Sequence, residues 1–262
     1  MRLNLSFTRI YALGLRHYFL TFRHLERFAD LFIFPIVGLL LWGFLANYVQ
    51  VQSQTLASFF LGGMILWIIF ERVGTSVGID FMYELWDRNL VNVLATPLTT
   101  IEFIGGLVLV SIVKVLVSLF AMVVIALFYY HFSIFSLGIS LVLFWINLVI
   151  FAVALGTFSI GVISRWGHSV GPLTWVLPFA IQPFAAVFYP VSILPVFFQK
   201  IVWFLPLAHV FEGMRYTIST RMFSFDHFFA ALGLNIIYFA LSISFFTFMF
   251  KRSKKSGTLA KL

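Results

Sequence analysis

Long apolar stretches separated by short polar breaks dominate the sequence after its first 30 residues. A helix needs about 20 mainly apolar residues to cross the hydrocarbon core of a bilayer, and six stretches are close to that length or exceed it. They cover residues 31–49, 56–79, 103–130, 137–163, 171–190 and 227–250. We therefore predict an all-α, polytopic membrane protein with six transmembrane helices.

The first 29 residues are too polar to cross a bilayer, but they carry a helical pattern. At about 100° per residue, positions seven apart fall near one side of a helix, and arginines recur at this interval opposite a set of apolar side chains. The arginines are Arg2, Arg9, Arg16 and Arg23, and the apolar side chains are Phe7, Tyr11, Tyr18, Phe22 and Leu25. The pattern predicts an amphipathic helix over residues 1–29 that lies in the membrane interface, with its arginines facing water or lipid phosphates.

Two longer breaks interrupt the six-span membrane domain, which we place at residues 30–262. The break at residues 80–102 is amphiphilic and begins with several charged residues. The break at residues 191–226 is rich in Leu, Phe and Trp, but Pro195 and Pro206 interrupt it. We predict that residues 191–226 form two short outer helices, which lie in the interface or re-enter the membrane.

Composition excludes a water-soluble globule. Hydrophobic residues make up 62% of the 262 positions and charged residues 10%, which leaves too little polar surface to cover a soluble fold. The net charge of +8 lies mainly at the two ends and in the breaks, where it suits an anionic lipid surface rather than nucleic acid. The chain has no cysteine, so it forms no disulfide and offers no thiolate to a metal.

The distribution of lysine and arginine predicts the orientation, because cytoplasmic loops carry an excess of both. Of the 17 such residues, two lie within spans and three, Lys200, Arg215 and Arg221, follow the fifth span. The other twelve fall on the side of the N-terminus. We therefore expect both termini and residues 80–102 to be cytoplasmic, and residues 191–226 to face outward.

Three charged residues lie inside predicted spans: Glu71 and Arg72 in the second, and Lys114 in the third. Each costs about 2.5–3.5 kcal/mol on insertion scales, so each needs a partner or a wet surface. At about 1.5 Å per residue, Glu71 and Lys114 lie at similar depths, which allows them to pair. Such a pair would line or gate a translocation path, or join two helices as a structural ion pair. Alternatively, the long side chains reach the interface separately.

Smaller motifs concern helix contacts and metal binding. Gly74 and Gly78 form a G-x-x-x-G pair that permits close helix approach, within one chain or between two chains. His209 and Glu212 are three residues apart, the interval of two metal ligands on one helical turn, and Arg215 follows at the same interval. Because no further ligands cluster nearby, we expect these three residues to make interfacial hydrogen bonds and the chain to bind no metal.

Local strings in both breaks suggest a family. They are ELWDRNLVNVLATPL at residues 84–98, YPVSILP at residues 189–195 and LPLAHVFEGMR at residues 205–215. With the N-terminal helix, six spans, charged loop and outer helices, the chain resembles the type-2 ABC exporter permeases over nearly its whole length.

The resemblance implies that residues 80–102 form a cytoplasmic coupling loop, whose helix docks on a nucleotide-binding subunit. A bulky side chain would fill a pocket on that partner, and flanking charges would fix the register. The residues assigned to this contact are Glu84, Leu85, Trp86, Asp87, Arg88 and Asn89. The resemblance also implies a working unit of two permease chains and two ATPase chains.

The sequence contains no G-x-x-x-x-G-K-[ST] phosphate loop. We therefore expect this chain to bind no cofactor and to be no enzyme, with ATP and Mg²⁺ bound by the partner. The predicted function is the transmembrane subunit of an ATP-driven exporter in the bacterial cytoplasmic (inner) membrane. Its substrate would be amphipathic, drug-like or a lipid-linked polysaccharide.

Two other functions stay open. A secondary transporter or channel is disfavoured by the scarcity of acidic residues near the membrane midplane and by the absence of repeated halves. A membrane-embedded lipid-modifying enzyme would use His209, Glu212 and Arg215 at the outer surface. That alternative is disfavoured because the sequence offers no convincing pair of nucleophile and general base.

Overall fold

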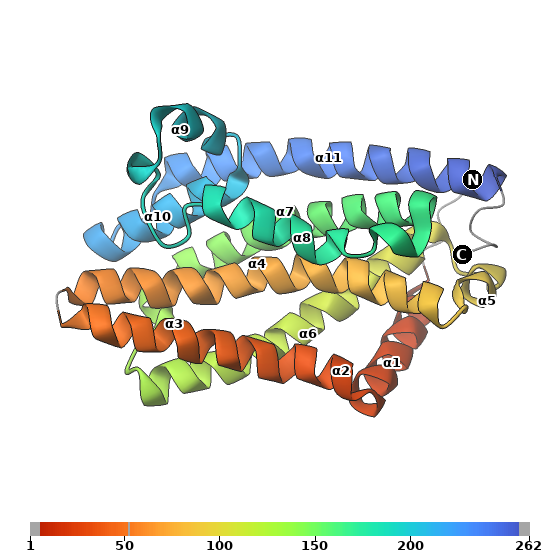
Figure 1. The fold of residues 1–262 in the computed structure, drawn as a ribbon, viewed down its shortest axis with the longest axis horizontal. Coiled ribbons are helices and arrows are strands. Elements are labelled where there is room, and N and C mark those ends of the chain that lie inside the picture. The colour runs from red at the N-terminus through yellow and green to blue at the C-terminus, as the bar shows by residue number, and fades with distance from the viewer. Residues whose placement is uncertain (1–5, 52, 257–262) are drawn as a thin grey trace.

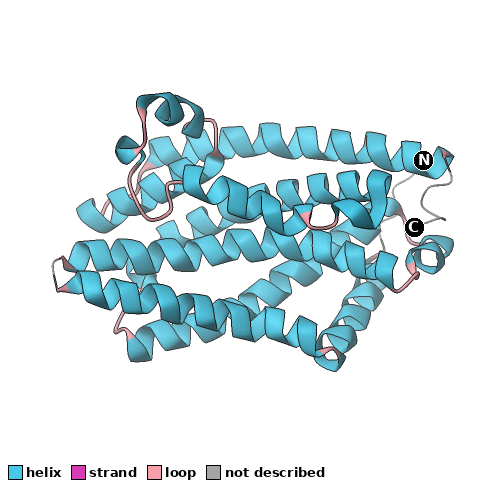
Figure 2. Cartoon of the chain, in the orientation of Figure 1, coloured by secondary structure: helices cyan, strands magenta, loops and turns pink. Residues whose placement is uncertain are grey.

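The computed structural model describes residues 6–51 and 53–256, and every regular element in these ranges is a helix (Figure 1 and Figure 2). Within these ranges, five helices are long and apolar enough to cross a membrane, which confirms an all-α polytopic membrane protein. Their bounds are Leu25–Gln50, Gln54–Trp86, Thr100–Tyr129, Ile139–Val170 and Phe225–Lys255.

These five helices are built from the following elements. The first comprises α2 (Leu25–Phe28), the π-helical turn η1 (Ala29–Ile33) and α3 (Phe34–Gln50), and the fourth comprises α7 (Ile139–Trp166) and η3 (Gly167–Val170). The others are α4 (Gln54–Trp86), α6 (Thr100–Tyr129) and α11 (Phe225–Lys255).

The fifth predicted span, residues 171–190, differs from the other five. It contains the nine-residue helix α8 (Leu173–Ile181) and the 3₁₀ turn η4 (Gln182–Phe184), after which the chain is irregular up to Pro190. Pro178 and Pro183 explain the break, because proline cannot donate a backbone hydrogen bond within a helix. In Figure 1, α8 nevertheless follows the long helices, and the chain beyond it reaches the end of the bundle that carries α9. The chain therefore passes along the bundle six times, five times as a long helix.

Residues 191–226 contain the short helices α9 (Val196–Val202) and α10 (Pro206–Thr220), with a 3₁₀ turn, η5 (Val191–Ile193), before them. Pro195 is the N-cap residue of α9, and Pro206 is the first residue of α10, where a missing backbone N–H is tolerated. Both helices lie at the end of the bundle away from α5 (Leu90–Ala95), as Figure 1 shows. The loop between α6 and α7 contains a further 3₁₀ turn, η2 (Ile134–Leu137).

The N-terminal helix α1 (Phe7–Arg23) ends six residues before the predicted boundary at residue 29, because His24 adopts an extended conformation. Arg2 lies outside the described residues. The face of α1 toward the bundle carries Leu13, His17 and Thr21, which are buried at four-residue intervals. Its other face exposes aromatic and aliphatic side chains, namely Tyr11, Leu15, Tyr18 and Phe22.

Helix α4 is the centre of the fold and contacts α3, α6, α7, α8 and α10. Its G-x-x-x-G pair packs inside the chain. A Cβ atom added at Gly78 would lie 2.4 Å from Thr174 Cγ2, and one at Gly156 of α7 would lie 2.9 Å from the carbonyl oxygen of Gly74. These glycines therefore let α7 and α8 approach α4 closely.

Candidate functional site

The predicted coupling residues lie at a sharp corner between two helices. Helix α4 continues to Trp86, seven residues beyond the end that the apolar pattern predicts, and the chain then turns through Asp87 and Arg88 into α5. Arg88 has a φ of 51°, in the left-handed region that a reversal of the chain uses. Residues 80–86 are thus the last two turns of a long helix rather than part of a separate loop.

The corner divides the predicted contact residues into two groups. Trp86, Asp87 and Arg88 are exposed, and Trp86 presents 46% of its surface. Glu84 and Leu85 are each only 1% exposed and face the interior of the chain. The structure therefore offers the first three side chains to a partner and gives the other two a role inside the chain.

Glu84 attaches the corner to the N-terminal helix. Its carboxylate forms an ion pair with Arg16 of α1, and it accepts a hydrogen bond of 2.9 Å from Nδ2 of the half-buried Asn89. On the other side of the corner, Arg27 Nη2 lies 3.9 Å from Asp87 Oδ2. Movement of the corner would therefore act directly on α1 and α2.

A second pair attaches α1 to α6. Arg9 Nη1 lies 3.3 Å from Glu102 Oε2 and donates to the Pro97 carbonyl oxygen at 2.6 Å. The predicted arginine stripe did not include these partners: Arg9 and Arg16 pair with carboxylates of α6 and α4, although about a third of each arginine side chain stays exposed. Arg23 is exposed, as predicted.

Lys114 pairs with Asp80, not with Glu71 as the depth argument allowed. Its Nζ lies 2.7 Å and 2.8 Å from the two carboxylate oxygens of Asp80. Glu71 and Asp80 are nine residues apart, which at about 100° per residue places them on opposite sides of α4. Because α4 stays helical through Asp80, that carboxylate lies on the side facing α6.

Glu71 and Arg72 belong to a separate cluster. Arg72 forms an ion pair with Asp30 of η1, and its Nε lies 3.8 Å from Glu71 Oε2. Each of the three charges predicted inside the membrane therefore has an opposite charge nearby, which reduces the penalty of its burial.

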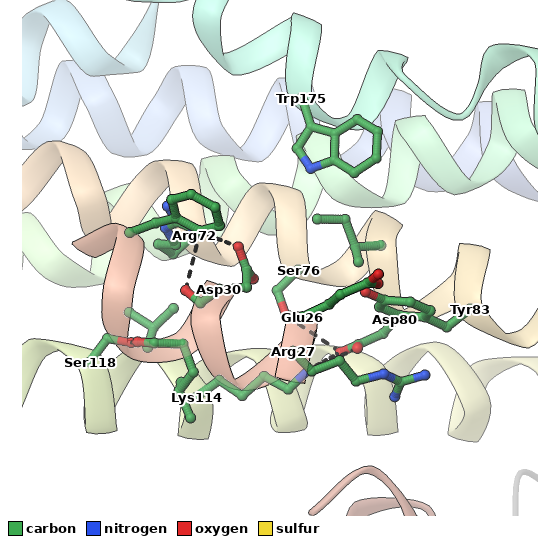
Figure 3. Close-up of a pocket in the computed structure, with 14 residues that line it drawn as sticks. Glu26, Arg27, Asp30, Arg72, Ser76, Asp80, Tyr83, Lys114, Ser118 and Trp175 are labelled. Atoms are coloured by element: carbon green, nitrogen blue, oxygen red, sulfur yellow. Dashed lines mark hydrogen bonds and ion pairs between the residues drawn. The ribbon is translucent and has the colours of Figure 1, made fainter. Parts of the chain in front are cut away.

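A cavity of about 320 Å³ lies between α2, η1, α4, α6 and α8, and its walls include Asp30, Arg72, Asp80 and Lys114 but not Glu71. Figure 3 shows Arg72 with Asp30 at one side and Lys114 with Asp80 at the other, with Trp175 of α8 above them. Arg72, Ser76 and Asp80 are spaced at four residues, so one face of α4 forms the polar wall. The cavity can hold a polar or charged group within the apolar bundle.

Sequence reasoning missed four residues of this region. Asp80 and Asp30 were not recognised as membrane charges, and His17 and Arg27 were treated as part of a surface helix. His17 is fully buried, with its ring nitrogens 3.6 Å from Asp80 Oδ1 and from Glu84 Oε1. The four-residue spacing of Arg72, Ser76 and Asp80 was the available signal for a continuous polar face.

At the other end of the bundle, the predicted residues of α10 bind neighbouring backbone. Glu212 Oε1 accepts a hydrogen bond of 2.6 Å from the Val191 backbone nitrogen and lies 3.2 Å from Arg215 Nη2. His209 Nε2 is 3.0 Å from the Trp203 carbonyl oxygen, and its Nδ1 is 3.3 Å from His227 Nδ1. Burial lowers the pKa of His209, and the nearby His227 acts in the same direction.

These contacts join α10 to the preceding turns and to α11. Among the described residues, no group of three or more His, Cys, Asp or Glu side chains is arranged to hold a metal ion. The hydrogen bonds of His209 and Glu212 instead supply fixed contacts between short helices.

Comparisons with known proteins identify the family. A sequence model described as ABC-2 type transporter matches residues 8–219, which run from the second residue of α1 to the last but one of α10. A comparison with curated proteins finds no match. The matched region contains the α4–α5 corner, the charged cavity and the short helix α9 with nearly all of α10, and it exceeds half of the chain. The chain therefore belongs to the ABC-2 type transporter family, as a multi-pass permease subunit.

Proposed function

We propose that the chain is the transmembrane subunit of an ATP-driven exporter, in which a separate nucleotide-binding subunit hydrolyses ATP. The observation that carries the proposal is the family match over residues 8–219. The sequence has no phosphate loop of its own, which favours nucleotide binding by a partner. The proposed working unit contains two copies of this chain and two ATPase subunits.

The proposed docking point for the ATPase is the α4–α5 corner. Trp86, Asp87 and Arg88 project there from the end of the longest helix, so a large side chain and two charges are available to a partner. A buried aromatic anchor surrounded by polar contacts is the usual centre of such an interface. The ion pair between Arg16 and Glu84 offers a route by which force at the corner would reach α1.

We place the complex in a bacterial cytoplasmic membrane, with the α4–α5 corner inside and α9 and α10 outside. The support is the excess of lysine and arginine on the side of the corner. The cargo class that suits the apolar bundle with its charged cavity is an amphipathic molecule, either drug-like or a lipid-linked glycan.

Replacement of Trp86 by alanine tests the docking point. If Trp86 fills a pocket on the ATPase, its loss should weaken assembly by about 2 kcal/mol or more, which is at least about tenfold. The measurement is co-purification of the ATPase with the tagged chain, together with ATP hydrolysis by the complex. Tyr48→Ala is the matched control, because Tyr48 is an exposed aromatic residue at the opposite end of the bundle. Equal recovery of the ATPase with both variants would exclude Trp86 as the anchor.

A further inference from the structure

Two hollows of different character meet where α1, η1 and α6 come together. One is the charged cavity, and the other is a groove of about 380 Å³ between α1 and α6. The groove has almost entirely apolar walls, formed by side chains such as Tyr18 and Val113 beside Gly14. Leu31 and Lys114 line both hollows, so the two are neighbours that share a wall. Together they form an amphipathic site, charged on one side and apolar on the other.

The charged side contains a guanidinium with unused donors. Arg27 lines the cavity and is only 6% exposed, yet its Nε and Nη1 have no hydrogen-bond partner among the described residues. Its remaining contacts are the 3.9 Å approach to Asp87 and a position 3.8 Å from the centre of the Tyr83 ring. A buried N–H group without an acceptor is unfavourable, and an anionic oxygen would satisfy it. The Nε of Arg72 also lacks a hydrogen-bond partner, but Arg72 and Lys114 each donate a hydrogen bond to a carboxylate. The carboxylate that pairs with Arg27 is 3.9 Å away, so Arg27 is the donor that a ligand would use.

The balance of charge in the cavity indicates which charges the head group of the ligand carries. Three cations, Arg27, Arg72 and Lys114, face three carboxylates, those of Glu26, Asp30 and Asp80. Glu26 is exposed and its carboxylate makes no ion pair within the described ranges, in contrast to the other two. A ligand head with one anionic and one cationic group would satisfy Arg27 and Glu26 without adding net charge to the cavity.

The α1–α6 groove suits the hydrocarbon part of the ligand. Exposed side chains of α1 and α6 form its rim, including Tyr18, Phe22 and Val113, so it opens outward between the two helices. In a membrane this opening faces lipid, from which a hydrocarbon chain can enter.

We propose that the two hollows bind one zwitterionic amphiphile: its phosphate on Arg27, its ammonium on Glu26 and one hydrocarbon chain in the α1–α6 groove. The binding site itself does not depend on the ATPase. The same ligand chemistry is found in a resident membrane lipid and in a transported amphiphile.

The test measures equilibrium binding of radiolabelled lysophosphatidylethanolamine to the full chain in detergent. This probe carries a phosphate, an ammonium and one acyl chain. We expect it to bind at least about tenfold more tightly than monoacylglycerol, which lacks the charged head, and than glycerophosphoethanolamine, which lacks the chain. Equal affinity for lysophosphatidylethanolamine and monoacylglycerol, or tighter binding of a simple alkylammonium, would overturn the proposal.

Substitutions distinguish the contribution of the ligand's charged head group from that of its hydrocarbon chain. Arg27→Gln should lower the affinity for lysophosphatidylethanolamine about tenfold and leave that for monoacylglycerol unchanged. Arg23→Gln is the control, because Arg23 is an exposed arginine four residues earlier that does not line the cavity. Glu26→Gln should weaken binding of lysophosphatidylethanolamine but not of lysophosphatidic acid, which has no ammonium. Equal effects of Arg27→Gln and Arg23→Gln would contradict the assignment of the phosphate.

A substitution in the α1–α6 groove provides a second test of the binding site if Arg27→Gln impairs folding. A Cβ atom at Gly14 meets no atom within 4 Å, so a leucine side chain can start there, and Gly14→Leu should occupy part of the groove and weaken the binding of both acylated ligands about tenfold. Gly105→Leu is the control, since Gly105 of α6 also has open space but lies outside the groove. Unchanged affinity in Gly14→Leu would overturn the placement of the hydrocarbon chain in the groove. Melting temperatures of the variants without ligand report on their folding.

The complex with the ATPase distinguishes the two sources of the amphiphile. Release of bound lysophosphatidylethanolamine on addition of ATP would identify it as cargo, whereas retention through ATP turnover would identify a resident lipid. Both results support the binding site. Failure of the ATPase to assemble would refute the proposed function and leave the binding measurements unaffected.

Discussion

The ion pair between Lys114 and Asp80 joins α6 to α4, and both oxygens of the buried carboxylate take part in it. Lys114→Met removes an ammonium that lies 2.7 Å and 2.8 Å from the two Asp80 oxygens. It leaves a carboxylate that is 1% exposed, with Ser76 Oγ at 3.4 Å and His17 Nδ1 at 3.6 Å as its remaining side-chain neighbours. Loss of one partner of a buried pair destabilises a protein by about 3–5 kcal/mol. Because the Lys114 side chain is itself 19% exposed, we expect the lower end, about 3 kcal/mol.

A double-mutant cycle on the free energy of unfolding in detergent measures this interaction. Asp80→Asn with Lys114→Met removes both charges, so the double variant should recover much of the stability that Lys114→Met loses, with a coupling energy of about 1.5–3 kcal/mol. The matched control is the cycle of Glu71→Gln with Lys114→Met, which should be additive within about 0.5 kcal/mol. A coupling energy below about 0.5 kcal/mol for Asp80 and Lys114 would refute the reasoning.

Three further predictions concern topology, helix packing and pH. Reporter fusions after positions 134 and 210 should lie outside the cell and a fusion after position 92 inside; an outside reporter at position 92 would contradict the orientation. Gly78→Val should destabilise the bundle by about 1–3 kcal/mol, because its Cβ would lie 2.4 Å from Thr174 Cγ2, whereas Gly105→Val, with open space, should leave the melting temperature unchanged. Since burial lowers the pKa of His209 from its ordinary value of 6.5, the unfolded chain binds the proton more tightly, and stability should fall as the pH drops below 6.5. This loss should be smaller in His209→Gln, and an identical dependence of melting temperature on pH in both proteins would count against it.

Hydropathy predicts the long helices well, because an apolar run of sufficient length has few alternatives to a membrane helix. It fails at the end of α4, where Asp80 and Glu84 read as a loop although the helix continues to Trp86. Hydropathy counts these carboxylates as unpaired charges, but in the folded chain Lys114 pairs with Asp80 and Arg16 pairs with Glu84. An ion pair between distant positions supplies the stability that local composition does not indicate.

The candidate site was harder to predict than the fold for the same reason. Depth along a helix allowed Glu71 to pair with Lys114, but the direction of each side chain around α4 selects Asp80 instead. The arginines of α1 follow an amphipathic pattern, yet Arg9 and Arg16 form ion pairs with carboxylates from α6 and α4. A single sequence shows which face of a helix is charged, but not which neighbour that face meets.

The exporter assignment is tested most directly by the native mass of the chain co-expressed with a candidate ATPase subunit from the same organism. The account predicts one complex whose mass equals two copies of this 30.0 kDa chain plus two ATPase subunits. ATP hydrolysis by that complex should disappear when the phosphate-loop lysine of the ATPase is replaced. Recovery of the chain without any ATPase, although both proteins are expressed in the same membranes, would contradict the account.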